Sequence, residues 1–421
     1  TTYNKGTLSN YDYPYAIQDS MRAALWASAW NLTEIGLPEG GKLQITYEAD
    51  DYGYVQHKRA MRFFEIEGFG NSASATPSLN IYGDAAGEKQ YVFVQLPEEL
   101  ETVSQVRSRY FQDIQQLYCK LFVPMPNTDK WGTGSEWIPL YADIEDIGFV
   151  GSERDRIWIK VKTVDGASPF RKVAIQFLRL NLPSKAYPNS ETGDNVDFGD
   201  MIKVIFSSFA QYAQLLKSFE SIAMKKGWNK AIESGRSFVR LDDPGLKKLG
   251  GGHRVKRIEL FDNWNALTSS AEAGASYGQE YDYSIMHEVG GVSLRGSSGV
   301  ASYEPVVGTD ENPFRVAVPN KEKTNLLAPA NLMFSEMPLG ESFFPGASVG
   351  YAKVRVTTIN KNVKSANGFA ETEFYTAREF PTLVEYTPLD AYSKKQFRSK
   401  LSDLLKIDSR QYMTVSQGFK V

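Results

Sequence analysis

An alternation of apolar and polar residues between positions 31 and 55 constrains this fold more than any other feature. Residues 31–37 (Asn-Leu-Thr-Glu-Ile-Gly-Leu) and 42–48 (Lys-Leu-Gln-Ile-Thr-Tyr-Glu) alternate apolar with polar side chains, which is the period of a strand with one buried face. Residues 38–41 (Pro-Glu-Gly-Gly) lie between them and have the composition of a turn. The sequence therefore predicts a β-hairpin here.

The composition extends this expectation to the whole chain. A length of 421 residues exceeds the usual size of one hydrophobic core, so we expect two or three packed units. Aromatic residues make up 13% of the chain, and large rings suit half-buried, pleated surfaces. We predict a β-rich α+β fold of antiparallel hairpins and sheets with three to five interspersed helices, which could form part of a larger β shell.

A polar stretch divides the predicted elements into two units. Residues 183–195 are rich in Pro, Ser, Asn, Gly and Glu and predict a linker. The unit 1–182 is expected to be β-rich, with an amphipathic helix at 102–122 whose apolar residues recur every three or four positions. The unit 196–421 is expected to contain a long helix at 201–226, then strands, and a charged surface helix at 388–407.

Several shorter elements can also be predicted. Helices are expected at 15–30 and at 168–181, where Ser168 would be the N-cap and Pro169 the first helical residue. Strand-like runs at 237–241 and 253–260 flank three glycines and predict a second hairpin. Further predicted strands are 61–69, 91–96, 156–162, 277–286, 349–359, 371–375 and 412–421, with glycine-rich loops at 288–299 and 338–350.

The charge balance and the single cysteine exclude several function classes. The chain has 47 Lys plus Arg against 50 Asp plus Glu, which gives no general electrostatic basis for binding nucleic acid or anionic membranes. Cys119 alone can form no internal disulfide, and its apolar neighbours predict a buried, unreactive thiol. The sequence has no apolar run long enough to span a bilayer, and we expect no cofactor.

An acidic cluster is the main candidate for a metal or catalytic site. Glu48, Asp50 and Asp51 could ligate Ca²⁺ or act as a glycosidase carboxylate pair. A Ca²⁺ loop normally spaces its oxygen donors more evenly, which favours a solvated strand end instead. We therefore assign no catalytic residue and no metal ligand. Glu48, Asp50 and Asp51 are the candidates to examine for a metal site.

An aromatic segment is the main candidate for a binding site. Trp131, Trp137 and Tyr141 could stack on sugar rings or contact a protein, although aromatic residues near strand ends more often close a core.

The remaining chemistry-bearing residues give no catalytic pattern. His57, His253 and His287 are far apart, and none has a metal-ligand spacing. Residues 296–299 (Gly-Ser-Ser-Gly) do not match a nucleophile elbow. We therefore predict that the chain is not an enzyme.

Several short segments resemble Rhs/YD-repeat proteins. Residues 37–48 (Leu-Pro-Glu-Gly-Gly-Lys-Leu-Gln-Ile-Thr-Tyr-Glu) resemble the Leu-Pro-x-Gly-Gly-x-Ile-x-x-x-Tyr unit of that family. Residues 251–258, 277–283, 350–354 and 373–381 resemble segments of large Rhs-like surface or secreted proteins of Bacteroidota, in the same order.

This resemblance implies a shell of consecutive hairpins, which in some relatives forms a cocoon around a toxic C-terminal domain. It implies a secreted or cell-surface location, with the remainder of the parent chain or assembly subunits as partners. The helices between the strands favour a scaffold over a cocoon. The leading hypothesis is a non-enzymatic structural segment of a larger exported protein, since residues 412–421 end as an unfinished strand. The alternatives are an adhesin-like module that binds glycan or protein through 131–141, and a carbohydrate-active enzyme.

Overall fold

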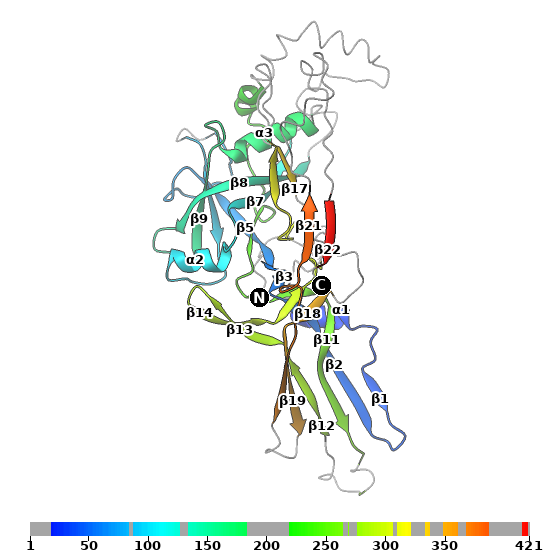
Figure 1. The fold of residues 1–421 in the computed structure, drawn as a ribbon. Helices are drawn as coiled ribbons and strands as arrows, with labels where there is room; N and C mark the ends of the chain where they lie inside the picture. The colour runs from blue at the N-terminus through cyan, green and yellow to red at the C-terminus, as the bar shows by residue number, and fades with distance from the viewer. Residues whose placement is uncertain are drawn as a thin grey trace, which may run out of the picture.

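The computed structural model of the chain is built from antiparallel β-sheets with a minority of helix (Figure 1). It describes residues 18–83, 87–126, 134–182, 219–263, 268, 276–305, 310–320, 333–336, 348–360, 368–386 and 415–419. Within these residues the predicted β-rich α+β class is confirmed. The two main bodies are a closed barrel and an open sheet that projects from it.

The barrel contains the main hydrophobic core. Its six strands follow the order β10 (Phe238–Asp242), β5 (Met61–Gly70), β6 (Tyr91–Gln95), β9 (Arg156–Val161), β8 (Ser135–Phe149) and β7 (Gln116–Pro124). Strand β7 pairs back to β10 and closes the ring. Closure leaves no free strand edge on the barrel.

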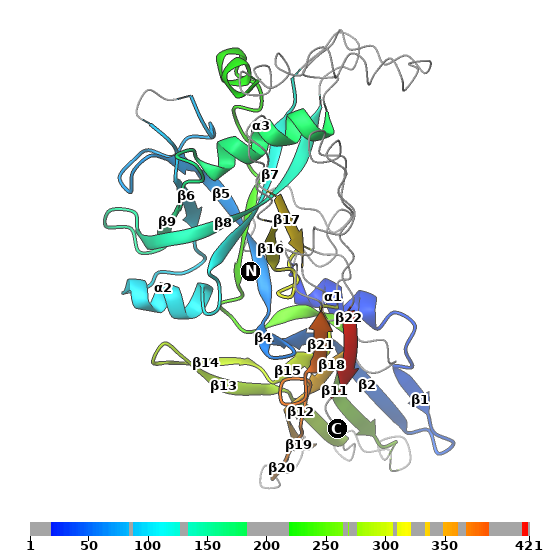
Figure 2. The same ribbon diagram turned by 45° about the horizontal axis from the view of Figure 1, so that its top comes forward.

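Helix α3 (Pro169–Asn181) lies across one end of the barrel in both ribbon views (Figure 2). As predicted, Ser168 is its N-cap residue and Pro169 opens it, although the Ser168 side chain makes no capping hydrogen bond. Phe170 and Leu178 are fully buried in the barrel core, and the Phe170 ring lies 4.8 Å from that of Phe69. The helix therefore closes the core at this end.

The predicted helix at 102–122 is wrong beyond its second turn. Helix α2 spans Val103–Tyr110 and begins with a capping box between Thr102 and Gln105, but residues 116–124 form strand β7. One face of β7 lies in the barrel core and the other lies under a second cluster that includes Tyr118. A strand buried on both faces has a continuous apolar run, which also contains helix-like spacings.

The projecting sheet contains the hairpin predicted at 31–55. Its strand order is β1 (Glu34–Gly36), β2 (Lys42–Tyr52), β11 (Lys248–Phe261), β12 (Ser276–Asp282), β19 (Lys353–Asn360) and β20 (Phe369–Glu373). Strands β1 and β2 form that hairpin. Helix α1 (Ser20–Ala27), capped by Asp19, contacts β2 and β11 and confirms the helix expected at 15–30.

The second predicted hairpin is wrong. Strand β10 belongs to the barrel, whereas β11 pairs with β2 and β12 in the projecting sheet. The three glycines at 250–252 lie inside β11 and have positive φ angles of 149°, 105° and 137°. They shift the register between Leu249 and His253, so the glycines bend one strand and do not join two.

The two predicted units do not correspond to separate sheets. The barrel joins β10 to strands that precede residue 182, and the projecting sheet joins β2 to β11. Both pairings cross the expected linker at 183–195, which itself lies outside the described residues. Of the predicted long helix, residues 219–226 are described and are helical. The helix expected at 388–407 also lies outside the described residues.

Smaller sheets complete the described fold. A four-stranded sheet has the order β18 (Val349–Tyr351), β15 (Gly299–Ala301), β3 (Tyr54–Val55) and β4 (Lys58–Arg59). Three two-stranded sheets pair β13 (Ser284–Val289) with β14 (Val292–Ser297), β16 (Ala317–Asn320) with β17 (Met333–Glu336), and β21 (Thr382–Tyr386) with β22 (Val415–Phe419). Strand β14 replaces most of the loop expected at 288–299, and β22 lies within the predicted strand 412–421.

Candidate functional site

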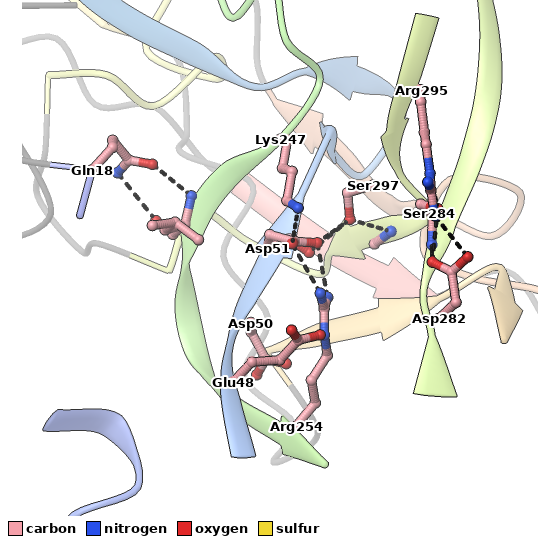
Figure 3. A network of polar contacts seen from close by, with 12 residues as sticks. Gln18, Glu48, Asp50, Asp51, Lys247, Arg254, Asp282, Ser284, Arg295 and Ser297 are labelled. Carbon is pink, nitrogen blue, oxygen red and sulfur yellow. Dashed lines mark hydrogen bonds and ion pairs between the residues drawn. The ribbon is translucent and has the colours of Figure 1, made fainter. Parts of the chain in front are cut away.

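The three candidate carboxylates lie close together near the C-terminal end of β2 (Figure 3). Arg254 of β11 approaches them from the neighbouring strand. Its Nε donates to Glu48 Oε1 at 2.8 Å, and its two terminal nitrogens donate to the two Asp51 oxygens at 2.8 and 2.9 Å. One guanidinium group thus holds two of the three candidates.

Asp51 also binds Ser297, the last residue of β14. The Ser297 hydroxyl donates to Asp51 Oδ1 at 2.5 Å and to the Asp51 carbonyl oxygen at 3.0 Å, and the amide of Gly299 donates to the same Ser297 oxygen at 2.8 Å. Lys247 Nζ lies 3.6 Å from Asp51 Oδ2. Since only 2% of Asp51 is exposed, the expectation of a solvated strand end is wrong for this residue.

Asp50 is buried beside Asp51 but has a different partner. The hydroxyl of Tyr351 in β18 donates to Asp50 Oδ1 at 2.6 Å. Burial raises the pKa of Asp50 above its usual value, and the Tyr351 hydrogen bond opposes that rise. A Cβ atom at Gly252 would stand 3.1 Å from Asp50 Oδ2, and the φ angle of this residue is 137°. Both the space and the backbone conformation therefore favour glycine at this position.

Two tyrosine rings cover the guanidinium group. Arg254 Cζ lies 4.4 Å from the ring centre of Tyr283 and 4.8 Å from that of Tyr351, within cation–π range. Burial alone would lower the pKa of Arg254, but the hydrogen bonds and charge of Asp51 raise it above its usual value. Burial raises the pKa of Tyr283 to about 12. Arg254 therefore stays charged and the tyrosine stays neutral at ordinary pH.

In this arrangement the three carboxylates act as hydrogen-bond acceptors for neighbouring side chains of the same chain. A bidentate arginine and two hydroxyl donors occupy oxygens that a Ca²⁺ ion or a sugar would otherwise require. Among the described residues, no group of three or more His, Cys, Asp or Glu side chains is placed to hold a metal ion. We call the group formed by Glu48, Asp50, Asp51, Arg254 and Tyr351 the Arg254 clamp.

A second buried ion cluster lies next to the clamp. Lys248 is 1% exposed, and its Nζ lies 3.1 Å from Glu304 Oε1 and 2.9 Å from Glu311 Oε2. The hydroxyl of Tyr52 donates to the same Glu304 oxygen at 2.6 Å. Glu311 also accepts the amide of Phe63, at 2.8 Å, in barrel strand β5. This cluster therefore ties the projecting sheet to the barrel.

A third cluster fixes the segment that contains Glu311 on the barrel wall. The carboxylate of Asp310 pairs with Lys120 of β7 and with Arg315. The guanidinium of Arg240 in β10 donates to the carbonyl oxygens of Asp310 and Asn312 at 2.8 and 3.1 Å. Buried charges are stable only when they are paired in this way.

The aromatic candidates do not form an exposed loop. Trp137 and Tyr141 lie in strand β8, on the outer side of the barrel. Tyr141 is buried, with its ring 4.9 Å from Tyr118 and 5.6 Å from Phe334, and Trp137 lies 4.6 Å from Phe122. They close a core between the barrel and β17. Trp131 lies outside the described residues.

The histidines are separate from one another. The ring of His253 makes an edge contact with Tyr47 at 5.3 Å, and its Nε2 lies 2.5 Å from Asn31 Nδ2. His287 Nε2 lies 2.9 Å from the carbonyl oxygen of Ser297, and burial lowers the pKa of His287. His57 packs against Phe314. Each has a local structural contact.

Sequence reasoning missed the cations that organise these clusters. Arg254 and Lys248 were expected only as residues of a strand or its flank, and Glu304 and Asp310 were not singled out. The available signal was a charged residue where strand alternation predicts an apolar one, as at Arg254, which has the parity of Ile258 and Leu260. That signal is weak because the partner carboxylates lie far away in the sequence.

Comparison of the chain with protein-family models, curated proteins and solved structures found no match. The resemblance to Rhs-like proteins therefore stays a prediction. None of the helices in the described part of the chain is both long and apolar enough to cross a membrane.

Proposed function

We propose that this chain is a non-enzymatic structural segment of a large exported Rhs-like protein, where it serves as scaffold in a shell or surface assembly. The observation that carries the proposal is the Arg254 clamp. Its residues come from β2, β11 and β18, and Ser297 adds β14. A cluster that joins strands so distant in sequence serves cohesion, because each contact closes a long loop of chain.

The burial of the candidate carboxylates also favours a structural role. A glycosidase needs two carboxyl groups that reach the substrate, one as acid and one as base or nucleophile. Asp50 and Asp51 are both buried, and their oxygens accept hydrogen bonds from Tyr351, Arg254 and Ser297. Carboxylates used in this way stabilise the fold and have little remaining capacity for a sugar.

The exported, Rhs-like part of the proposal rests on the resemblance of residues 37–48, 251–258, 277–283, 350–354 and 373–381. The first four of these segments lie in or beside the projecting sheet and the clamp. The resemblance therefore falls on strands that contact one another, as expected of segments that build one structural unit.

Two experiments test the proposal. In the first, the purified chain is incubated with a panel of polysaccharides, and released reducing sugar is measured for wild type, Asp50→Ala, Asp51→Ala and the exposed turn control Glu39→Ala. We expect no turnover from any of them. Turnover by wild type and Glu39→Ala that is lost in both aspartate variants would overturn the non-enzymatic assignment.

The second experiment addresses export. An antibody raised against the purified chain is used on fractionated source cells and culture medium. We expect the antigen in the surface or medium fraction, on a polypeptide much larger than 47.2 kDa. Antigen confined to the cytosolic fraction would contradict an exported scaffold.

A further inference from the structure

One face of the projecting sheet is charged. Residues that pair across antiparallel strands share a face, so Arg257 and Glu280 lie on the same side, where their side chains form an ion pair at 2.8 Å. Glu371 pairs on this side with Lys353 and Arg355. These charges suit a face that stays in water.

The opposite face is apolar and uncharged. Strand pairing places Ile35, Leu43, Leu260 and Tyr277 in one row, and Ile45 and Ile258 in the next. The other paired positions on this side, beyond the glycine bend, are apolar or are Thr, Gln and Asn; none is Asp, Glu, Lys or Arg. The bulge residue Lys256 lies outside this pairing.

Within the described part of the chain, no layer covers this apolar face. None of its paired residues beyond the glycine bend is buried, and Ile35 and Tyr277 are 40% and 46% exposed. By contrast, the barrel strands bury most of their apolar side chains. A sheet normally buries one face against another layer, and the described residues supply no such layer for the projecting sheet.

The exposed apolar surface continues along helix α1 and the segment after it. Trp30 is 100% exposed, and Met21, Leu25 and Trp26 are each more than 60% exposed. The Tyr47 hydroxyl, on the apolar face, donates to the Leu32 carbonyl oxygen at 3.0 Å, which joins this segment to the sheet. Contiguous apolar surfaces of this kind mark interaction sites.

We infer that a second copy of this chain covers this surface, with the two apolar faces packed together as a symmetric β-sandwich. Flat sheet faces pack on one another at about 10 Å with interdigitated side chains. A two-fold axis brings each residue near its own copy, which would set like charges together on the charged face. The apolar face carries no charge at its paired positions, so it fits its own copy without repulsion.

The same surface fits other occupants less well. A nucleic acid or a charged peptide would find no opposite charge on it. Addition of a strand at the sheet edge is also disfavoured, because β1 is three residues long and β20 carries Glu371 and Glu373. Face-to-face pairing is the arrangement that buries the apolar residues.

The test is the oligomeric state of the full chain, measured by sedimentation velocity from about 1 to 100 μM, a range that covers the affinities of ordinary dimers. The informative variant is Thr358→Glu, which puts a charge on the apolar face at an exposed position. The matched control is Thr46→Glu, also exposed, on the charged face beside Arg257. Circular dichroism verifies that both variants fold.

We expect a wild-type dimer whose dissociation constant rises at least about tenfold in Thr358→Glu, because two buried like charges would face each other, and stays within about twofold in Thr46→Glu. Trp30→Ser should also weaken the dimer. A monomeric wild type up to 100 μM, or equal weakening by both glutamate variants, would overturn the inference. Flotation of a monomeric wild type with neutral lipid vesicles would instead identify a membrane as the occupant and would equally overturn it.

Discussion

Arg254 and Asp51 form a bidentate ion pair, with nitrogen–oxygen distances of 2.8 and 2.9 Å, although 203 positions separate them in the sequence. The pair joins β11 to β2 at the level where three glycines bend β11. The glycine bend and the ion pair therefore lie at the same level of β11, and the ion pair holds β11 and β2 together there.

Replacing Arg254 should destabilise the fold strongly. Arg254→Met removes the bidentate partner of the buried Asp51 carboxylate and leaves it only the exposed Lys247 at 3.6 Å, and breaking a buried pair costs about 3–5 kcal/mol. Urea unfolding followed by tryptophan fluorescence measures the change. Arg22→Met, which removes an exposed pair with Asp19, is the control and should leave the midpoint nearly unchanged. Equal midpoints for Arg254→Met and wild type would contradict the role of the clamp.

Lys248 offers an independent test at the second cluster. Lys248→Met removes the cation that pairs with both the buried Glu304 and the partly buried Glu311, so the free energy of unfolding should fall by about 3–5 kcal/mol. Adding Glu304→Gln should recover part of this loss, because it removes one of the uncompensated charges. A double variant that is less stable than Lys248→Met would show that the carboxylate does not depend on the lysine.

Asp242 predicts a specific dependence of stability on pH. Burial raises the pKa of Asp242 to about 6. The folded protein therefore binds this proton more tightly than the unfolded chain, and stability falls as pH rises from about 4 to 6. Asp242→Asn resembles the protonated form, so its stability relative to wild type should increase by up to about 3 kcal/mol between pH 4 and 7. Urea unfolding at several pH values measures this difference, and a difference independent of pH would contradict it.

Cys119 should be unreactive in the native protein. It is fully buried in the barrel core, and burial raises the pKa of its thiol. A thiol reagent such as dithionitrobenzoate should label it at pH 8 only in urea, at a rate that follows unfolding. Complete labelling of the folded chain within minutes would show that the barrel opens or that this strand is misplaced.

Local signals in the sequence predicted the elements that local interactions determine. The β1–β2 hairpin follows from alternation and a glycine turn, and α3 follows from Ser168 and Pro169 together with its apolar stripe. The helix predicted at 102–122 failed where tertiary contacts decided. Thr102 and Gln105 do start a helix, but Cys119 pairs with Leu140 and Val239 in the barrel.

The Arg254 clamp could not be predicted from local sequence signals either, because tertiary contacts form it. Glu48, Asp50 and Asp51 could be found as a cluster, but their burial depends on Arg254 and Tyr351, about 200 and 300 residues away. An acidic run without a visible partner is normally solvated, so the prediction of exposure was reasonable on the sequence and wrong in the fold.

The most direct test of the clamp as the point of cohesion is amide hydrogen exchange, measured by mass spectrometry on wild type and Asp51→Asn. This variant keeps the side-chain volume but weakens the bonds to Arg254 and Ser297. We predict that exchange becomes faster in three places together: the C-terminal end of β2, which contains Asp51, and strands β15 and β18. Exchange in barrel strands β6 and β9 should not change. Unchanged exchange in β15 and β18, or an equal increase throughout the barrel, would contradict the account.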